Sequence, residues 1–477
     1  MKRIVNFGTK GQYMRIWTLL LFVTVLCTCT TSENITIDGV IEVPENRENP
    51  DSRTLKLVYK VLKAKEADST KSPIVYLQGG PGAATLVMEE FWENHPLRND
   101  RDIVLMDQRG TGKSEANCTE IGATIFVVLR DDLLGESQYR TLDTILSNCK
   151  ENLKQKGVDL AGYTSKENAA DFEDLRKVLG YDKWNLWGVS YGSRLGLTIM
   201  RDFPESVRSA MLAGILAPEI DYLNNTVQNF ENSLFFIFNR CENNIECNNR
   251  YPNLKERLLN VLEKLQTAPL RFDLEGELFV LNPQDALLVL FFSLYDRNSI
   301  GNIPILIEAM ETGETEPLNN ALKNIEHLYT FINWSMNYSV MVYEEIPFYD
   351  AVAIDQYLKQ SELGSGFASY RSEMQLLADW HSFRAANFED QPVISEIPTL
   401  MVSGGLDHVT PSSNAKKALK HLKNGYEVVF PDDGHNLFNP CFFQIAEDFL
   451  NNPLQKPNSA CSTERNPIEW NILNPIH

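Results

Sequence analysis

The apolar and polar positions of the chain predict short strands that alternate with helices. Residues 35–44 and 54–63 alternate apolar with polar side chains and predict a hairpin-like pair of strands. Short, mainly apolar runs that end in loops follow at 74–77, 103–106, 184–187, 210–213, 399–402 and 427–430. Helical spacing of apolar residues separates several of these runs, as at 168–179. Strands that are buried on both faces and alternate with helices predict a mostly parallel sheet flanked by helices, an α/β fold.

The segment 218–391 interrupts this alternation. It holds longer helical patterns, at 253–265, 303–310 and 370–384, and few strand-like runs. We therefore expect an inserted, mainly helical cap at 218–391, with the sheet built from residues 30–217 before it and 392–477 after it.

The first 29 residues form a separate segment. Lys2, Arg3, Lys10 and Arg15 precede an apolar run at 16–27, which is short for a membrane span and typical of a signal peptide. Either Cys27 or Cys29 is the lipid-modified first residue of a lipoprotein, or cleavage occurs further on. Export is expected in both cases, to the periplasm, the medium or a lipid-anchored place at the cell surface. A lipid anchor is the one membrane attachment that the sequence suggests.

Composition narrows the function classes. The 477 residues are 43% hydrophobic and 23% charged, which is typical of a large globular protein. Asp and Glu number 64 against 44 Lys and Arg, a formal charge of -20. Because no cluster of basic residues is available to neutralise phosphates, a nucleic acid partner is not expected.

Cysteine usage agrees with export. Six cysteines beyond position 29 fall into three sequence-local pairs, which predict three disulfides in an oxidising compartment: Cys118–Cys149, Cys241–Cys247 and Cys441–Cys461. Other pairings and free buried thiols remain alternatives. The spacings of metal-binding cysteine and histidine motifs are absent from the sequence, so neither a metal nor an organic cofactor is expected.

A candidate nucleophile follows the run 184–187. Ser190 lies in Gly188-Val189-Ser190-Tyr191-Gly192, between a predicted strand and a predicted helix. Small residues on both sides of a serine allow the sharp turn that projects its hydroxyl outward. The sequence therefore indicates Ser190 as a nucleophile.

A serine nucleophile requires a base and an acid that orients the base. Asp407 follows the strand predicted at 399–402, and His435 follows the strand predicted at 427–430. The order serine, acid, histidine along such a sheet is that of one class of serine hydrolases. We assign Asp407 as the acid and His435 as the base; an ordinary surface histidine is the alternative for His435.

Two glycine-containing loops are candidates for anion binding. The loop Gln78-Gly79-Gly80-Pro81-Gly82 follows the run 74–77, and the amides of Gly80 and Tyr191 are predicted to form an oxyanion hole. An ordinary Gly-Pro turn is the alternative for this loop. A phosphate-binding loop is disfavoured at 107–114, because Asp107 occupies the position where that motif requires glycine.

Taken together, these motifs resemble the prolyl and tripeptidyl aminopeptidase family of α/β-hydrolase-fold serine peptidases. The resemblance spans about residues 36–461 and rests on the motifs at 79–82, 107–114, 188–193, 404–411 and 434–435. It implies removal of one to three residues from the free amino terminus of a peptide substrate, through an acyl-enzyme. Gln78 stands where the prolyl branch usually has histidine, which disfavours that branch. The expected export, the paired cysteines and the long cap resemble the tripeptidyl branch, which is therefore favoured.

The resemblance also implies acidic residues in the cap that bind the substrate's ammonium group. Glu344 and Glu345 are the best local match, and a solvated surface is their alternative. A carboxylesterase or lipase-like hydrolase remains the competing function, because fold and triad do not determine the acyl group. A non-catalytic binding protein would not require all of Ser190, Asp407 and His435.

Overall fold

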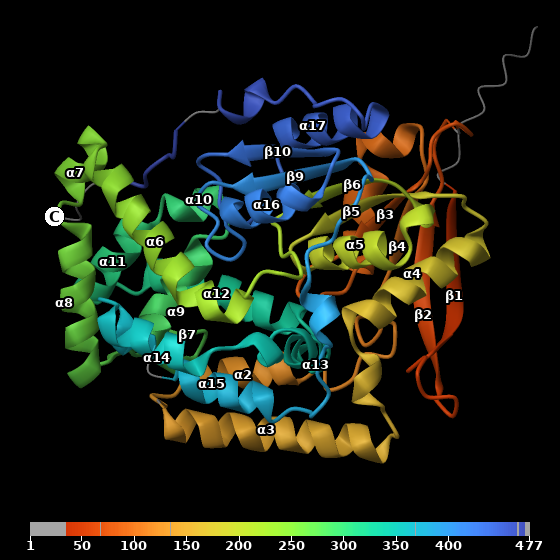
Figure 1. Ribbon diagram of the computed structural model, residues 1–477. Coiled ribbons are helices and arrows are strands. Elements are labelled where there is room, and N and C mark those ends of the chain that lie inside the picture. Colours follow the sequence, from red (N-terminus) through yellow and green to blue (C-terminus); the bar gives the residue numbers. More distant parts are fainter. Residues whose placement is uncertain (1–34, 67, 134, 368, 465–466, 473–477) are drawn as a thin grey trace, which may run out of the picture. The chain divides into compact units, whose positions relative to one another are not determined.

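The computed structural model describes residues 35–66, 68–133, 135–367, 369–464 and 467–472 (Figure 1). The predicted signal peptide at 1–29, with Cys27 and Cys29, lies outside these residues. Within the described part, no helix has the length and hydropathy that crossing a membrane requires.

An eight-stranded sheet forms the centre of the fold, in the order β1-β2-β4-β3-β5-β6-β9-β10. The pairs β1/β2 and β2/β4 are antiparallel, and the remaining neighbours are parallel, which confirms the predicted mostly parallel sheet. The strands are β1 (Thr36–Pro44), β2 (Thr54–Leu62), β3 (Ile74–Leu77), β4 (Ile103–Met106), β5 (Trp184–Val189), β6 (Val207–Ala213), β9 (Thr399–Gly404) and β10 (Gly425–Phe430).

Helices occupy most of the remaining described chain. In chain order they are α1 (Glu89–Glu93), α2 (Ile121–Leu129), α3 (Glu136–Gln155), α4 (Ser165–Leu179), α5 (Tyr191–Asp202), α6 (Tyr222–Glu242), α7 (Ile245–Arg250), α8 (Leu254–Thr267), α9 (Pro283–Ser293), α10 (Arg297–Ile300), α11 (Ile303–Thr312), α12 (Glu316–Phe331), α13 (Trp334–Glu344), α14 (Ala351–Gln360), α15 (Tyr370–Ala378), α16 (Ser412–Ala418) and α17 (Pro440–Asn451).

Each face of the sheet is covered by a separate apolar cluster. Phe172 of α4, Leu195 of α5 and Ala415 of α16 pack with one set of strand side chains. Trp92 of α1 and Phe449 of α17 pack with the other set. Strands β3, β4 and β9 are buried along their whole length, and cover on both faces explains the apolar runs at 74–77, 103–106 and 400–402 that they contain.

The residues between β6 and β9 are mainly helical, with one antiparallel hairpin, β7 (Leu270–Leu274) and β8 (Glu277–Leu281). Their core is a third cluster that includes Phe230, Leu290 and Ile307. Helices α2 and α3, which precede this segment in the chain, lie alongside it: α2 contacts α12, and α3 contacts α15 (Figure 1). The helical region, defined here as the helices between β6 and β9 together with α2 and α3, is therefore built from two separate stretches of sequence.

One predicted helix is shorter than expected. The pattern at 370–384 predicted a helix to Arg384, whereas α15 ends at Ala378. Trp380 turns inward, is 2% exposed, and donates its indole N–H to Ser339 Oγ at 2.9 Å. Burial of this large side chain and its hydrogen bond stabilise the turn after Ala378, so the helix ends there instead of continuing to Arg384.

The three predicted disulfides are confirmed. Cys118–Cys149, Cys241–Cys247 and Cys441–Cys461 are bonded, with Cα atoms 5.8, 5.2 and 6.0 Å apart. Each bridge joins neighbouring elements rather than distant parts of the chain, as the local pairing indicated.

Candidate active site

Ser190 lies at the sharp turn between β5 and α5. Its φ of 56° and ψ of -124° are unusual for a residue with a side chain. A Cβ at Gly188 would lie 2.3 Å from the Gly192 carbonyl oxygen, and one at Gly192 would lie 1.9 Å from the Leu77 carbonyl oxygen. The flanking glycines are therefore needed for the chain to turn so tightly, which is the physical reason for the pattern around Ser190.

Asp407 and His435 come from the loops after β9 and β10. His435 Nδ1 lies 2.9 Å from Asp407 Oδ2, and Thr410 Oγ1 lies 2.6 Å from the same carboxylate oxygen. Because β9 and β10 are parallel neighbours, the loops at their carboxyl ends meet at one edge of the sheet. The structure thus brings the predicted acid and base into direct contact.

The surroundings of Asp407 keep it ionised. The backbone amides of Val409 and Thr410 each donate to its Oδ1 at 2.8 Å. Burial by itself would raise the pKa of Asp407, but the charge of His435 and the hydrogen bonds from His435 and Thr410 lower it to about 2. A permanently charged carboxylate at Nδ1 can orient the imidazole ring and stabilise its protonated form.

His435 lies close to the turn that carries Ser190. A Cβ at Gly214, the residue after β6, would be 3.1 Å from His435 Cε1, so the absence of a side chain there makes room for the ring. The neighbouring Ala213 accepts a hydrogen bond from the Ser190 amide at 2.8 Å. The imidazole therefore lies beside the backbone of β6 that supports Ser190.

The predicted oxyanion donors are Gly80 and Tyr191. Tyr191 is the first residue of α5, so its amide has no acceptor within the helix. Gly80 follows β3 in a loop next to Ser190, as a Cβ at Gly79 would lie 3.1 Å from Ser190 Cβ. Both residues thus lie next to the nucleophile candidate.

Asp107 supports this loop rather than a phosphate. Its carboxylate accepts hydrogen bonds from the amides of Thr85, Leu86 and Lys113 at 2.7 to 2.8 Å. The first two amides directly follow the Gly80 loop. The carboxylate therefore ties the segment 107–113 to the segment that carries Gly80.

His408, the neighbour of Asp407, is fully buried and faces aromatic rings. Its ring centroid lies 4.2 Å from that of Phe291 and 5.5 Å from that of Tyr295. Burial lowers the pKa of His408 to about 3, so this histidine stays neutral and packs among these aromatic rings.

Ser190 lines a cavity of about 400 Å³. Gly80 and Thr410 line it near Ser190, and the remaining wall comes mainly from apolar and aromatic side chains of the helical region. These wall residues include Leu216, Tyr222, Phe291, Tyr295, Tyr329, Trp334, Tyr338, Met341, Phe367, Tyr370 and Met374. A cavity of this size and composition suits a small ligand or the end of a larger one.

Glu344 and Glu345, the predicted ammonium ligands, contact Arg194 instead of lining this cavity. Glu344 Oε2 lies 2.7 Å from Arg194 Nε, and Glu345 Oε1 lies 2.8 Å from an Arg194 terminal nitrogen. The side chains are 4 to 6% exposed, so the alternative of a solvated surface is wrong. Burial raises the pKa of Glu345 to about 7, although the charge of Arg194 lowers it.

Two acidic residues that the sequence did not single out line the cavity. Asp285 accepts a hydrogen bond from the Asn282 amide in a helix cap, and its pKa is raised well above the usual value by burial. Glu373, on α15, has no hydrogen-bond or ion-pair partner among the described side chains, and burial raises its pKa to about 7. The titratable groups around Glu373 include the phenols of Tyr329, Tyr338 and Tyr370.

The chain matches two family models. Residues 72–244 match the model described as alpha/beta hydrolase fold, and residues 364–461 match the model described as TAP-like protein. The two ranges together cover more than half of the chain, and they include Ser190, Asp407 and His435.

Curated relatives carry peptidase names. The proline iminopeptidase of Aeromonas sobria is 30% identical over 181 residues, which are 37% of this chain and 36% of that protein. The tripeptidyl aminopeptidase of Streptomyces lividans is 26% identical over 194 residues, which are 38% of this chain and 36% of that protein. The chain thus spans about a third of the length of the relatives that it matches.

Solved structures include a proline iminopeptidase-related protein from Thermus thermophilus. It is 16% identical with a TM-score of 0.38, and the match covers 88% of this chain and 98% of that one. The chain has the α/β-hydrolase fold, and parts of it are similar to proline iminopeptidases and tripeptidyl aminopeptidases.

Proposed function

We propose that this protein is an exported serine exopeptidase that releases one to three residues from the free amino terminus of peptides. The observation that carries the proposal is the Asp407–His435 pair beside Ser190, together with the cavity that Ser190 and Glu373 both line. The names of the relatives support a peptidase, and the fold supports a hydrolase.

The proposed reaction proceeds through an acyl-enzyme. His435 Nε2 accepts the Ser190 proton while Ser190 Oγ attacks the scissile carbonyl carbon, and the amides of Gly80 and Tyr191 stabilise the oxyanion. His435 then returns the proton to the leaving amine. In the second half, His435 activates water, which releases the amino-terminal fragment from Ser190. Asp407 keeps the imidazole oriented in both halves.

Glu373 is the group that we propose for recognition of the substrate's amino terminus. A peptide whose carbonyl lies at Ser190 and whose first residues extend into the cavity brings its ammonium group among helices α2, α9, α13 and α15. There the walls are apolar, and a carboxylate with no partner among the described side chains gains most from a cationic ligand. Asp285 lies on the same cavity and adds a second acidic group.

This assignment differs from the one expected at Glu344 and Glu345. Both carboxylates already have cationic and hydrogen-bonding partners in Arg194, Ser165 and the Tyr222 amide. A substrate ammonium would have to displace Arg194 from them. Glu373 requires no such exchange.

We further propose that residues 218–391 act as a cap over the catalytic edge, assisted by α2 and α3. The proposal of export is supported by the three disulfides, since such bonds persist in oxidising compartments.

The competing function is that of a carboxylesterase, which the largely apolar cavity wall favours. The test is hydrolysis of peptide anilides with one to three residues, and of simple esters, by the mature protein and by Ser190→Ala. Turnover of anilides that is lost in the variant supports the peptidase, and the preferred length identifies the fragment released. Turnover of esters alone would replace the proposal by the esterase function.

A further inference from the structure

Helix α13 is bonded at its amino-terminal end to the loop that carries Gly80. The Asn333 amide donates to the Gly82 carbonyl at 2.9 Å, and the Asn337 side chain donates to the Pro81 carbonyl at 3.0 Å. Ala83 and Ile332 form an isolated bridge beside these bonds. Three successive residues after Gly80 are thus held by one end of α13.

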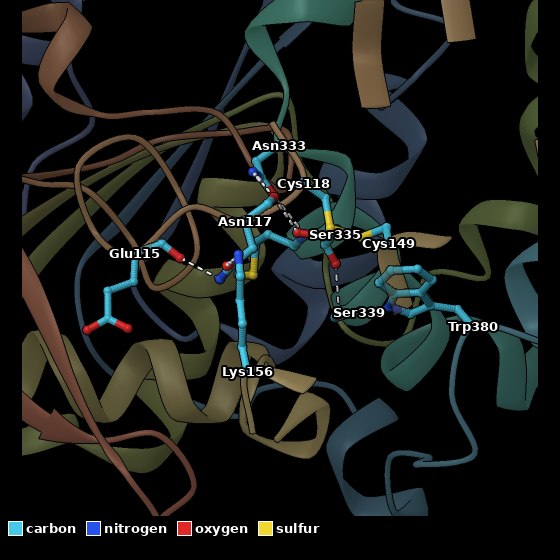
Figure 2. The surroundings of a disulfide bond; sticks show 10 residues. Glu115, Asn117, Cys118, Cys149, Lys156, Asn333, Ser335, Ser339 and Trp380 are labelled. Carbon is cyan, nitrogen blue, oxygen red and sulfur yellow. Dashed lines mark hydrogen bonds between the residues drawn. A yellow bond between two sulfur atoms is a disulfide. The ribbon is translucent and has the colours of Figure 1, made fainter. Parts of the chain in front are cut away.

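This end of α13 is itself held from the other side. Asn333 and Ser335 both donate to the carbonyl of Asn117, at 2.9 and 3.1 Å, and Asn117 precedes the disulfide-bonded Cys118 (Figure 2). Figure 2 also shows Trp380 beside Ser339, one turn further along the helix. The start of α13 therefore has little freedom to shift relative to the disulfide and the Gly80 loop.

The carboxyl-terminal end of α13 is bonded to α5, the helix that starts at Tyr191. Glu344 is the last residue of α13 and Glu345 is its cap, and both hold Arg194 at the distances given above. Arg194 lies four residues after Ser190, on the first turn of α5. Because Arg194 and both carboxyl groups are buried together, separating them would leave the Arg194 charge unpaired and out of water, so the contact is strongly favoured once formed.

A second set of bonds joins Glu344 to Tyr191 itself. Glu344 accepts hydrogen bonds from the Ser165 amide at 2.6 Å and the Ser165 hydroxyl at 2.9 Å. The same hydroxyl lies 2.9 Å from the Tyr191 phenol. Glu344 therefore contacts Arg194 of α5 directly, and it is linked to Tyr191 of the same helix through the Ser165 hydroxyl.

From these contacts we propose that α13 sets the spacing between the two oxyanion donors, with Arg194, Glu344 and Glu345 as positioning residues. One end of this helix, roughly 16 Å long, holds the loop of Gly80, and the other end holds the helix of Tyr191. Its middle residues Asn337, Tyr338 and Met341 line the substrate cavity, so a ligand in the cavity touches the same element. The inference rests on the proposed function, because it takes Gly80 and Tyr191 as the oxyanion donors. It does not depend on which acyl group the enzyme cleaves.

Glu344→Gln tests the helix from its carboxyl end and Asn337→Ala from its amino end. Glu308→Gln is the matched control, because Glu308 forms a half-buried ion pair with Arg250 between α11 and α7. The readouts are kcat and KM for an anilide and an ester, and affinities for a peptide aldehyde and for the released peptide product. With the aldehyde, Ser190 Oγ bonds to the carbonyl carbon, the C=O pair moves to oxygen, and the Ser190 proton passes to His435.

If α13 positions the donors, both test variants lower kcat about tenfold or more, with KM changed less than about threefold. Aldehyde affinity falls by a similar factor, because its adduct has the oxyanion. Product affinity stays unchanged in Glu344→Gln, and in Asn337→Ala it falls less than aldehyde affinity, because Asn337 also lines the cavity. Glu308→Gln changes none of these values. The proposal is overturned if kcat is retained in a folded variant, or if aldehyde and product affinities fall by the same factor.

Two further outcomes separate this proposal from the proposed function. If native protein hydrolyses esters but no anilide, the peptidase function fails, while the ester kcat and the aldehyde affinity still decide the role of α13. If Glu344→Gln does not fold, Asn337→Ala decides it alone, since Asn337 forms a neutral hydrogen bond and leaves no buried charge when it is removed.

Discussion

The edge of the sheet and the helical region contribute to the site in different ways. Ser190, Asp407 and His435 follow β5, β9 and β10 directly, and short loops hold them in place. The cavity wall comes instead from helices of two separate stretches, and its acidic residues lie on α9 and α15. In the proposed function, the catalytic residues thus follow strands, whose positions the sheet determines, and the recognition residues lie on helix faces, whose direction depends on packing.

The largest expected effect is at the sheet edge. Ser190→Ala removes the nucleophile, so we expect turnover to fall by at least about 10⁴-fold, with the fold and product binding retained. Steady-state kinetics with calorimetric product titration measures both. A variant that keeps substantial turnover would show that the sheet edge does not carry the chemistry.

The helical region should affect recognition instead of chemistry. Glu373→Gln removes the charge but keeps the shape, so we expect kcat/KM for free-amino substrates to fall about 30-fold. Acetylated substrates should be unaffected, and Glu314→Gln, on a different cavity, is a control. An equal loss for acetylated substrates would mean that Glu373 supports the fold of the cavity.

The pH dependence should follow Glu373. Its raised pKa of about 7 means that the carboxylate is mostly protonated at pH 6 and mostly charged at pH 7.5. Because the charged form binds an ammonium group, KM for free-amino substrates should rise roughly fivefold between pH 7.5 and pH 6, after allowance for the substrate amino group, which is itself only partly charged at pH 7.5. The dependence should be absent for acetylated substrates and in Glu373→Gln; its persistence there would assign it to another group.

The smallest expected effect concerns the helices far from Ser190. Replacing Cys241 and Cys247 by serine opens a loop with a sequence separation of 6 between α6 and α7. We expect the free energy of unfolding to fall by about 2 kcal/mol, with kcat and KM unchanged. Chemical denaturation measures the first and kinetics the second. Lost activity would show that the remote helices also shape the site.

The sequence predicted the strand-associated part of the site because the signals there are local. Glycines on both sides of Ser190 are required by the turn itself, and the loops of Asp407 and His435 directly follow apolar runs. The pattern of buried strands likewise predicted a mostly parallel sheet, which the structure confirms.

The helical part could not be predicted in the same detail. Glu373 looks like a surface position in sequence, because a helix pattern does not show that α15 faces a cavity. Glu344 and Glu345 were singled out, but their partner Arg194 is about 150 residues away in the chain, and local spacing carries no information on such a contact. The packing of α2 and α3 onto the inserted helices is long-range in the same sense.

One measurement tests the central claim most directly: the ratio of kcat/KM for a tripeptide anilide with a free amino terminus to that for its acetylated form. If the sheet edge cleaves what Glu373 recognises, native protein should give a ratio of about 30 or more near pH 7.5. A ratio near one, with Ser190 still required for turnover, would contradict amino-terminal recognition and leave a hydrolase of different specificity.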